Sequence, residues 1–201
     1  MMGKVKEMKT AMLAVLIGLG LMLQVCVANA GPRESIVVAG GCFWCVESDF
    51  EGVPGVISAV SGFSGGKSKN PTYKSHAGHY EAVKITFDAG KVSREKLLHM
   101  FMRSIDPTDA GGQFCDRGSA YKTAVFYSGA GEKAVAKQAV AQAGADLGRK
   151  IATKVLPLNG FYPAEAYHQD YYKKNPNRYK FYRWKCGRDQ RVKAVWKNIT
   201  E

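Results

Sequence analysis

Residues 35–47 read SIVVAGGCFWCVE, and this stretch does most to indicate how the chain folds. Its first residues form a short apolar run that ends at glycines, a pattern typical of a buried strand. Gly40 and Gly41 break the run, and the residues from Cys42 to Glu47 are typical of the start of a helix. The stretch therefore predicts a buried strand that leads directly into a helix, with a cysteine at the junction.

Strands and helices alternate irregularly along the rest of the chain. Period-two or apolar runs predict strands at Val56–Val60, Ala82–Phe87, Thr123–Tyr127 and Ile151–Leu156. Helices are predicted after the N-cap residue Ser93, over 131–147 and over Pro163–Tyr172, with polar loops at 64–79 and 105–120. We expect an α+β fold, in which a mixed sheet packs with helices as a two-layer sandwich with a ferredoxin-like core. A long irregular C-terminal segment would follow.

The composition describes a globular chain: among 201 residues, 46% are hydrophobic and 23% charged. This excludes collagen-like, coiled-coil and disordered proteins. The formal net charge of +12 is concentrated in residues 171–201, where aromatic residues interleave the cations. Such a tail could bind single-stranded nucleic acid. We favour the alternative that its aromatics pack on the domain while its cations stay in water, and we expect no nucleic-acid partner.

Residues 1–30 have the features of a signal peptide. A lysine-containing start precedes the apolar residues 11–27 and the small-x-small sequence Ala28-Asn29-Ala30. We predict cleavage after Ala30, export to the periplasm and a mature domain at residues 31–201. An uncleaved membrane anchor and a lipoprotein acylated on Cys26 are the alternatives. Otherwise, we expect no membrane association.

Cys42 would lie at a helix N-terminus, where unpaired backbone N–H groups lower the pKa of a thiol. Cys45 follows three residues later. This spacing is compatible with a thioredoxin-like dithiol, with half of a zinc site, or with an attacking and a resolving cysteine. A zinc site would need a second pair, whereas Cys115 and Cys186 are isolated in the sequence. We therefore expect a nucleophilic or redox role for Cys42, with no metal.

Several motifs resemble the signature of the peptide methionine sulfoxide reductase A family. They occur in order, and the similarity as a whole covers roughly residues 36–196. The motifs are Gly41-Cys42-Phe43-Trp44 with Glu47, Pro71-Thr72-Tyr73, Gly78-His79-Tyr80-Glu81, Asp106-Pro107-Thr108-Asp109, Gly112–Gly118 with Tyr121, Ala164–Tyr171, and Lys174-Asn175-Pro176.

The resemblance implies a role for each matching residue. Cys42 would attack the sulfur of methionine-S-sulfoxide, and Glu81 would donate a proton to the departing oxygen. Tyr73 and Tyr121 would hydrogen-bond that oxygen, with Asp116 lining the same pocket. The rings of Phe43 and Trp44 would surround the S-methyl group. This sequence departs from the family in the loop between Tyr73 and Glu81, which is about four residues shorter than in many members.

The attack would leave Cys42 as a sulfenic acid, which a second thiol converts to a disulfide. The familiar members have glycine at the position of Cys45 and resolve with cysteines in a glycine-rich tail. Three candidates exist here, and we rank Cys186 first, Cys45 second and Cys115 third.

These inferences predict a monomeric protein-repair enzyme without a bound cofactor. Its substrates would be oxidised proteins and free methionine-S-sulfoxide, and its reductant thioredoxin or an exported thioredoxin-like dithiol. The alternatives are a general dithiol–disulfide oxidoreductase that uses Cys42 and Cys45, and a basic binding protein that uses the C-terminal tail.

Overall fold

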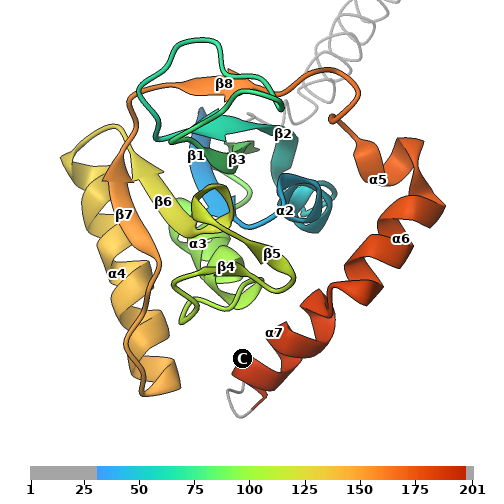
Figure 1. The fold of residues 1–201 in the computed structure, drawn as a ribbon. Helices are drawn as coiled ribbons and strands as arrows, with labels where there is room; N and C mark the ends of the chain where they lie inside the picture. Colours follow the sequence, from blue (N-terminus) through green and yellow to red (C-terminus); the bar gives the residue numbers. More distant parts are fainter. Residues whose placement is uncertain (1–30, 198–201) are drawn as a thin grey trace, which may run out of the picture. The chain divides into compact units, whose positions relative to one another are not determined.

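The computed structural model describes residues 31–197, and a six-stranded mixed sheet lies at its centre (Figure 1). The strands follow the order β7-β6-β1-β3-β2-β8. They are β1 (Arg33–Gly40), β2 (Val56–Ser64), β3 (Tyr80–Asp88), β6 (Thr123–Tyr127), β7 (Lys154–Pro157) and β8 (Phe161–Pro163). Neighbouring strands are antiparallel except β6 and β7, which are parallel.

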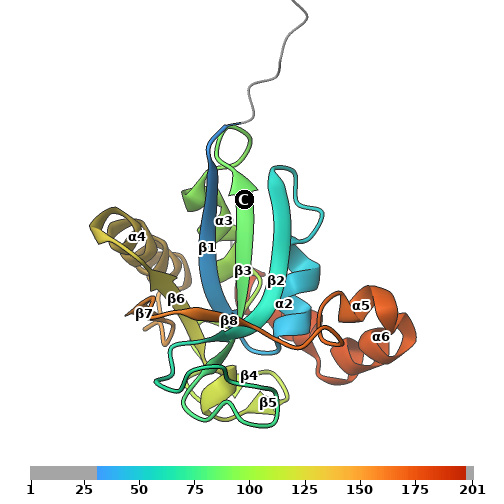
Figure 2. The ribbon, with the colours of Figure 1, turned by 90° about the horizontal axis from the view of Figure 1, so that it is seen from above.

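Three helices, α2 (Phe43–Phe50), α3 (Arg94–Arg103) and α4 (Ala130–Leu147), share one core with the sheet (Figure 2). The four inner strands have the spatial order β6-β1-β3-β2. Along the chain, α2 connects β1 to β2, and α3 lies between β3 and β6. This is the arrangement of a ferredoxin-like core. The predicted α+β fold is therefore confirmed.

Strand β1 is buried on both faces of the sheet. Ile36 and Val38 belong to the core shared with the helices, whereas Val37 and Ala39 pack with Phe126 in a second cluster. Because successive side chains of a strand point to opposite faces, burial on both faces requires an unbroken apolar run. Burying each of the Ile and Val side chains stabilises the fold by about 1.5–3 kcal/mol, which explains why this part of β1 is apolar.

The predicted irregular C-terminal segment is instead helical. It forms α5 (Tyr171–Lys174), α6 (Pro176–Lys185) and α7 (Arg188–Trp196), which follow one another along the side of the domain that carries α2 (Figure 1). Pro176 suits the first turn of α6, because proline has no N–H to leave unpaired there. Asp49 of α2 forms ion pairs with Arg183 and Arg188. These long-range ion pairs fix the segment in a way that no local pattern signals.

The basic tail behaves only partly as expected. Tyr179 and Trp196 are buried, but Phe181 and Trp184 are 59% and 68% exposed. Arg188 is only 1% exposed, contrary to the prediction that the cations stay in water. Its two terminal guanidinium nitrogens donate to the carbonyls of residues 40 and 104 and to the Asp49 carboxylate, and these bonds replace the hydration of those nitrogens.

Three other expectations need correction. The helix predicted at 163–172 is absent. After β8 the chain forms turns until α5 begins, and in this segment the side chain of Gln169 hydrogen-bonds to the backbone of Ser61. Strand β7 begins at Lys154 rather than Ile151, because the two preceding N–H groups bind the Pro107 carbonyl. The polar loop at 105–120 contains a short hairpin of β4 (Gly112–Gln113) and β5 (Asp116–Arg117).

The predicted signal peptide lies outside the described residues. Within residues 31–197, no helix combines the length and apolar character that a membrane span requires.

Candidate active site

A small cavity of about 60 Å³ lies at the N-terminus of α2. Its lining residues are Cys42, Phe43, Trp44, Tyr73, Glu81, Asp116, Tyr121 and Tyr182. The first seven are the residues to which we assigned catalytic or substrate-binding positions from the sequence, and the fold brings all of them together. Tyr182, from α6, was not foreseen. The volume is about that of two water molecules, which suits a small group such as S-methyl.

The junction between β1 and α2 places Cys42 in this cavity. Gly41 adopts a φ of +83°, a conformation that other residues rarely adopt. A Cβ at this position would also lie 2.6 Å from the Cβ of Gln113. The chain therefore needs glycine before Cys42, which then forms the N-cap of α2 and is 6% exposed.

The resting state of Cys42 differs from our expectation of a lowered pKa. Burial, its hydrogen bond with Cys45 and the nearby acidic groups raise the pKa of the Cys42 thiol well above its usual value. The N–H group of Phe43, which could have stabilised a thiolate, donates to Glu81 instead, at 3.0 Å. Cys42 is therefore held as a thiol at neutral pH and needs a base before it can attack.

Cys45 is the thiol that ionises more readily. The hydrogen bond from Cys42 lowers the pKa of Cys45, and the positive charges of Arg188 and Arg183 lower it further against the effect of burial. Its side chain is 2% exposed and packs with Cys42 and Tyr179. A second thiol, with a different proton affinity, thus packs directly behind the Cys42 thiol that lines the cavity.

Glu81 occupies the cavity from the second residue of β3. Burial raises the pKa of its carboxyl group to about 8, although the Phe43 N–H bond opposes the shift. The negative charge of Asp116 acts in the same direction as burial. At neutral pH Glu81 is therefore mostly protonated, as a proton donor must be.

Two tyrosines approach Glu81 from different segments. Tyr121 ends a short 3-10 helix (Ser119–Tyr121), and its phenol hydrogen-bonds with both Glu81 and Tyr73. The shortened loop still brings Tyr73 to the cavity, because its backbone N–H donates to the Glu165 carboxylate at 3.1 Å. Burial raises the pKa of both phenols, so both keep the proton needed for donation.

Aromatic rings form the apolar wall. The Trp44 indole stacks on Tyr171 with ring centroids 3.8 Å apart, and its N–H donates to His168 Nδ1 at 3.1 Å. The imidazole of His168 also lies beside the ring of Phe43, at 5.1 Å. Burial lowers the pKa of His168, which keeps the ring neutral and able to accept the indole proton. Trp44 is therefore fixed in orientation before any ligand binds.

The 106–118 motifs hold Asp116 in position. The Gln113 side chain bonds to the backbone N–H and carbonyl of Asp106, and Arg117 forms an ion pair with Asp109. The carboxylate of Asp116 then accepts a hydrogen bond from the Tyr182 phenol. Burial raises the pKa of Asp116.

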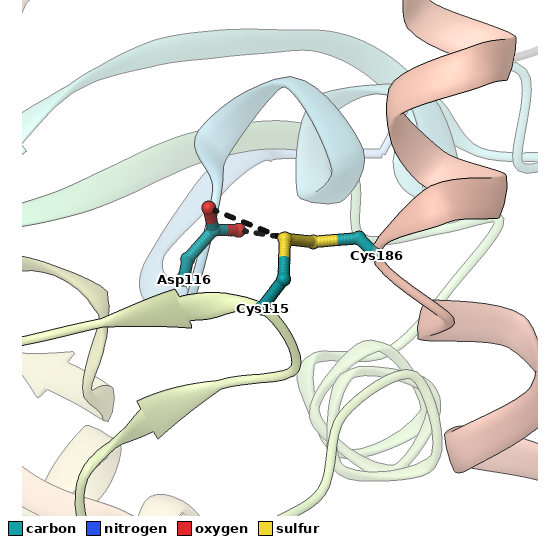
Figure 3. Close-up of side chains that lie close together, drawn as sticks. All are labelled: Cys115, Asp116 and Cys186. Atoms are coloured by element: carbon teal, nitrogen blue, oxygen red, sulfur yellow. Dashed lines mark hydrogen bonds between the residues drawn. A yellow bond between two sulfur atoms is a disulfide. The ribbon is translucent and has the colours of Figure 1, made fainter.

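Cys115 and Cys186, two of the three candidates for the resolving cysteine, form a disulfide with each other (Figure 3). The third candidate, Cys45, remains a free thiol beside Cys42. The bond connects the hairpin that carries Asp116 to the end of α6. A carboxylate oxygen of Asp116 lies 3.8 Å from each of the two disulfide sulfurs.

The sequence reasoning overlooked three contributors to the site. Glu47, quoted only within a motif, accepts bonds from Ser61 and from the backbone of Asp170, and so holds α2 to β2 and to the segment before α5. His168 orients Trp44. Tyr182 belongs to the basic tail, where no spacing distinguishes it from the other aromatics.

Comparison with known proteins gives a consistent result. Residues 34–200 match the family model described as "Peptide methionine sulfoxide reductase". Peptide methionine sulfoxide reductase MsrA 2 of Rhizobium meliloti (strain 1021) is 49% identical over 171 residues, covering 84% of this chain and 86% of the relative. The protein of the same name from Caulobacter vibrioides is 48% identical, with coverages of 84% and 89%.

Solved structures show the same similarity. Methionine sulfoxide reductase A of Corynebacterium diphtheriae has 32% identity and a TM-score of 0.69, covering 72% of this chain and 76% of its own. Mxr1 from Saccharomyces cerevisiae in reduced form has 26% identity and a TM-score of 0.68, with coverages of 72% and 87%. Mxr1 in complex with Trx2, at 18% identity, covers 74% and 91% with a TM-score of 0.52 and is similar in fold alone.

Proposed function

Because this chain belongs to the peptide methionine sulfoxide reductase A family and is a thiol-dependent methionine sulfoxide reductase, we propose that its catalytic cycle begins at Cys42 in the 60 Å³ cavity. One feature of the cavity supports this assignment. A buried thiol and a carboxyl group with a pKa of about 8 line the same small cavity. The reacting sulfur and a protonated acid thus lie together at neutral pH.

The substrate is methionine-S-sulfoxide, free or within oxidised proteins. Its S-methyl group lies against Phe43 and Trp44, and its oxygen accepts hydrogen bonds from Tyr73 and Tyr121. The sulfur of Cys42 attacks the sulfoxide sulfur while Glu81 protonates the oxygen. The substrate S–O bond and the new S–S bond then break as the hydroxyl group transfers to Cys42, so methionine leaves and Cys42 becomes a sulfenic acid whose proton came from Glu81.

Cys45 is the resolving cysteine in this proposal. The Cys45 sulfur attacks the Cys42 sulfenic acid, the S–O bond of Cys42 breaks, the departing hydroxyl group takes the Cys45 thiol proton and leaves as water, and a Cys42–Cys45 disulfide forms. Three observations support Cys45 over Cys186, the first-ranked candidate from the sequence: it packs against Cys42, its pKa is lowered, and Cys186 is already bonded to Cys115. A low pKa also makes Cys45 the better leaving group when an external thiolate attacks the sulfur of Cys42.

A dithiol protein of the thioredoxin type is the proposed reductant. It takes up the two oxidising equivalents of the Cys42–Cys45 disulfide and returns both thiols. Residues 1–30 have the sequence features of a signal peptide, and we extend the proposal to an exported enzyme that meets its reductant in the periplasm. The Cys115–Cys186 bond suits an oxidising compartment and supports this location.

The test of the activity uses two epimers and one variant. The purified protein, with a chemical dithiol, is offered peptides that contain methionine-S-sulfoxide or its R epimer. We expect consumption of the S epimer only, and none by the Cys42→Ser variant. Reduction of neither epimer, or full activity of Cys42→Ser, would refute the proposal. Disulfide reduction of insulin without sulfoxide reduction would support the general oxidoreductase instead.

Export is tested separately. Fractionation of the producing bacterium, with mass spectrometry of the protein's N-terminus, should find a periplasmic protein that begins at Gly31. An intact N-terminus in the cytoplasmic fraction would contradict this location.

A further inference from the structure

The cavity contains one phenol that neither the sequence motifs nor the proposed cycle uses. Tyr182 lies on α6, beyond the last motif of the resemblance. Its ring packs edge-on against Trp44, with centroids 6.0 Å apart, and its hydroxyl group lines the cavity. This hydroxyl donates a hydrogen bond to Asp116, and the Tyr182 side chain packs against the buried cluster that contains Cys42. It therefore lies between the nucleophile and a carboxylate.

A phenol has one proton to donate and lone pairs that accept. Since the proton of Tyr182 is directed to Asp116, the lone pairs of its oxygen are free to accept the S–H proton of Cys42. We propose that Tyr182 is a catalytic residue that relays the Cys42 proton to Asp116 and so generates the attacking thiolate. The proposal rests on the function proposed above.

The relay balances without an external reagent. The S–H bond of Cys42 breaks and a new O–H bond forms on Tyr182. At the same time, the original O–H bond of Tyr182 breaks and its proton joins Oδ2 of Asp116. The sulfur becomes a thiolate, the carboxylate becomes neutral, and the net charge of the cavity is unchanged. The proton now on Tyr182 hydrogen-bonds to the thiolate and stabilises it.

Burial acts on the two ends of this transfer in opposite senses. Burial raises the pKa of Cys42, so the thiol needs a base, and burial also raises the pKa of Asp116, which makes its carboxylate a better proton acceptor. Cys45 is the competing acceptor for the Cys42 proton. The titratable and charged groups around the two ends are Cys45, Glu81 and Tyr182 beside Cys42, and Tyr182, Arg188, Glu81, Tyr73 and Tyr121 around Asp116.

A disulfide links the two segments that form the relay. Cys115 immediately precedes Asp116, and Cys186 follows Tyr182 by one helical turn. The Cys115–Cys186 disulfide therefore joins the two segments that supply the acceptor and the relaying phenol.

The test measures thiol reactivity in the Cys45→Ser background, which removes the competing acceptor. Alkylation of the free protein by iodoacetamide is followed by mass spectrometry on the peptide that contains Cys42. We expect Tyr182→Phe to slow this alkylation roughly 10²-fold at pH 7, the lower end of the range for proton-transfer catalysis. The deficit should close near pH 10, where hydroxide deprotonates Cys42 directly. Single-turnover formation of methionine should show the same pH-dependent ratio.

Two further variants separate a relay from packing. Asp116→Asn accepts a hydrogen bond but no proton, so it should match Tyr182→Phe, and the double variant should be no slower than either single one. Tyr172→Phe is the matched control, because Tyr172 also donates from α5 to a carboxylate, that of Glu51, but does not line the cavity.

Three results would overturn the relay: an equal deficit at every pH, unchanged reactivity in Tyr182→Phe, or additive effects in the double variant. Because alkylation needs no sulfoxide, a protein that shows the relay but reduces neither epimer would refute the proposed function alone.

Discussion

Replacing Glu81 by glutamine should make the protein more stable and the enzyme much slower. The substitution keeps an oxygen that can accept the Phe43 N–H, so the 3.0 Å bond and the shape of the site are preserved. It removes only the transferable proton. Loss of a general acid costs about 10²–10⁴ in rate, or roughly 3–5 kcal/mol in transition-state stabilisation.

The gain in stability follows from proton linkage. The pKa of Glu81 is raised from 4.5 to about 8 on folding, so the unfolded chain binds fewer protons than the native state between these values. The carboxyl group therefore causes no loss of stability below pH 4.5, and the penalty grows as the pH rises toward 8. At pH 7 it amounts to about 3 kcal/mol, at 1.36 kcal/mol per pH unit. Glutamine does not titrate and avoids this penalty.

Thermal unfolding at two pH values tests the reasoning. Glu81→Gln should melt about 6–12 °C above the wild type at pH 7, since each kcal/mol moves the midpoint by roughly 2–4 °C in a domain of this size. At pH 4.5 the difference should nearly vanish. Glu165→Gln serves as a control, because that partly exposed carboxylate also accepts a backbone N–H. The same difference at both pH values, or a lower midpoint at pH 7, would show that Glu81 is not held protonated by burial.

Three further substitutions probe the cycle and the aromatic wall. Cys45→Ser should still form one equivalent of methionine but accumulate a sulfenic acid that dimedone traps; normal turnover with a protein dithiol would exclude Cys45 as the resolving residue. Replacing Cys115 and Cys186 together by serine should lower the free energy of unfolding by about 4 kcal/mol, because the bond spans 71 residues, as chemical denaturation would measure. That variant should still form the disulfide of the cycle, and a block at the sulfenic acid would return the resolving role to Cys186. His168→Phe should raise KM for the sulfoxide several-fold with little effect on kcat, because it frees the Trp44 indole; a fall in kcat at constant KM would contradict a positioning role.

A part of the site can be predicted from the sequence when the residues that position it are close together along the chain. The fold around Cys42 could be predicted because an apolar strand, two glycines and a helix start are encoded within thirteen consecutive residues. The cavity could be predicted only as a set of motifs, since the approach of Tyr73, Glu81 and Asp116 to one another depends on the sheet and its loops. Tyr182 could not be predicted, because the ion pairs of Arg183 and Arg188 with Asp49 place α6 and the start of α7, and charge pairing across 134 and 139 residues leaves no periodic signal.

The same limit explains the incorrect expectation for Cys42. A helix N-terminus lowers the pKa of a thiol only where its N–H groups are available to the sulfur and water is near. Here the Phe43 N–H belongs to Glu81, and Cys42 is 6% exposed, so burial dominates. The consequence extends to the chemistry. A cavity that raises the pKa of Cys42, Glu81 and Asp116 alike tolerates little negative charge at once. Moving the thiol proton to Asp116 exchanges one anion for another and leaves Glu81 protonated. The acid then loses its proton only when the sulfoxide oxygen takes it, which couples proton donation to the attack at sulfur.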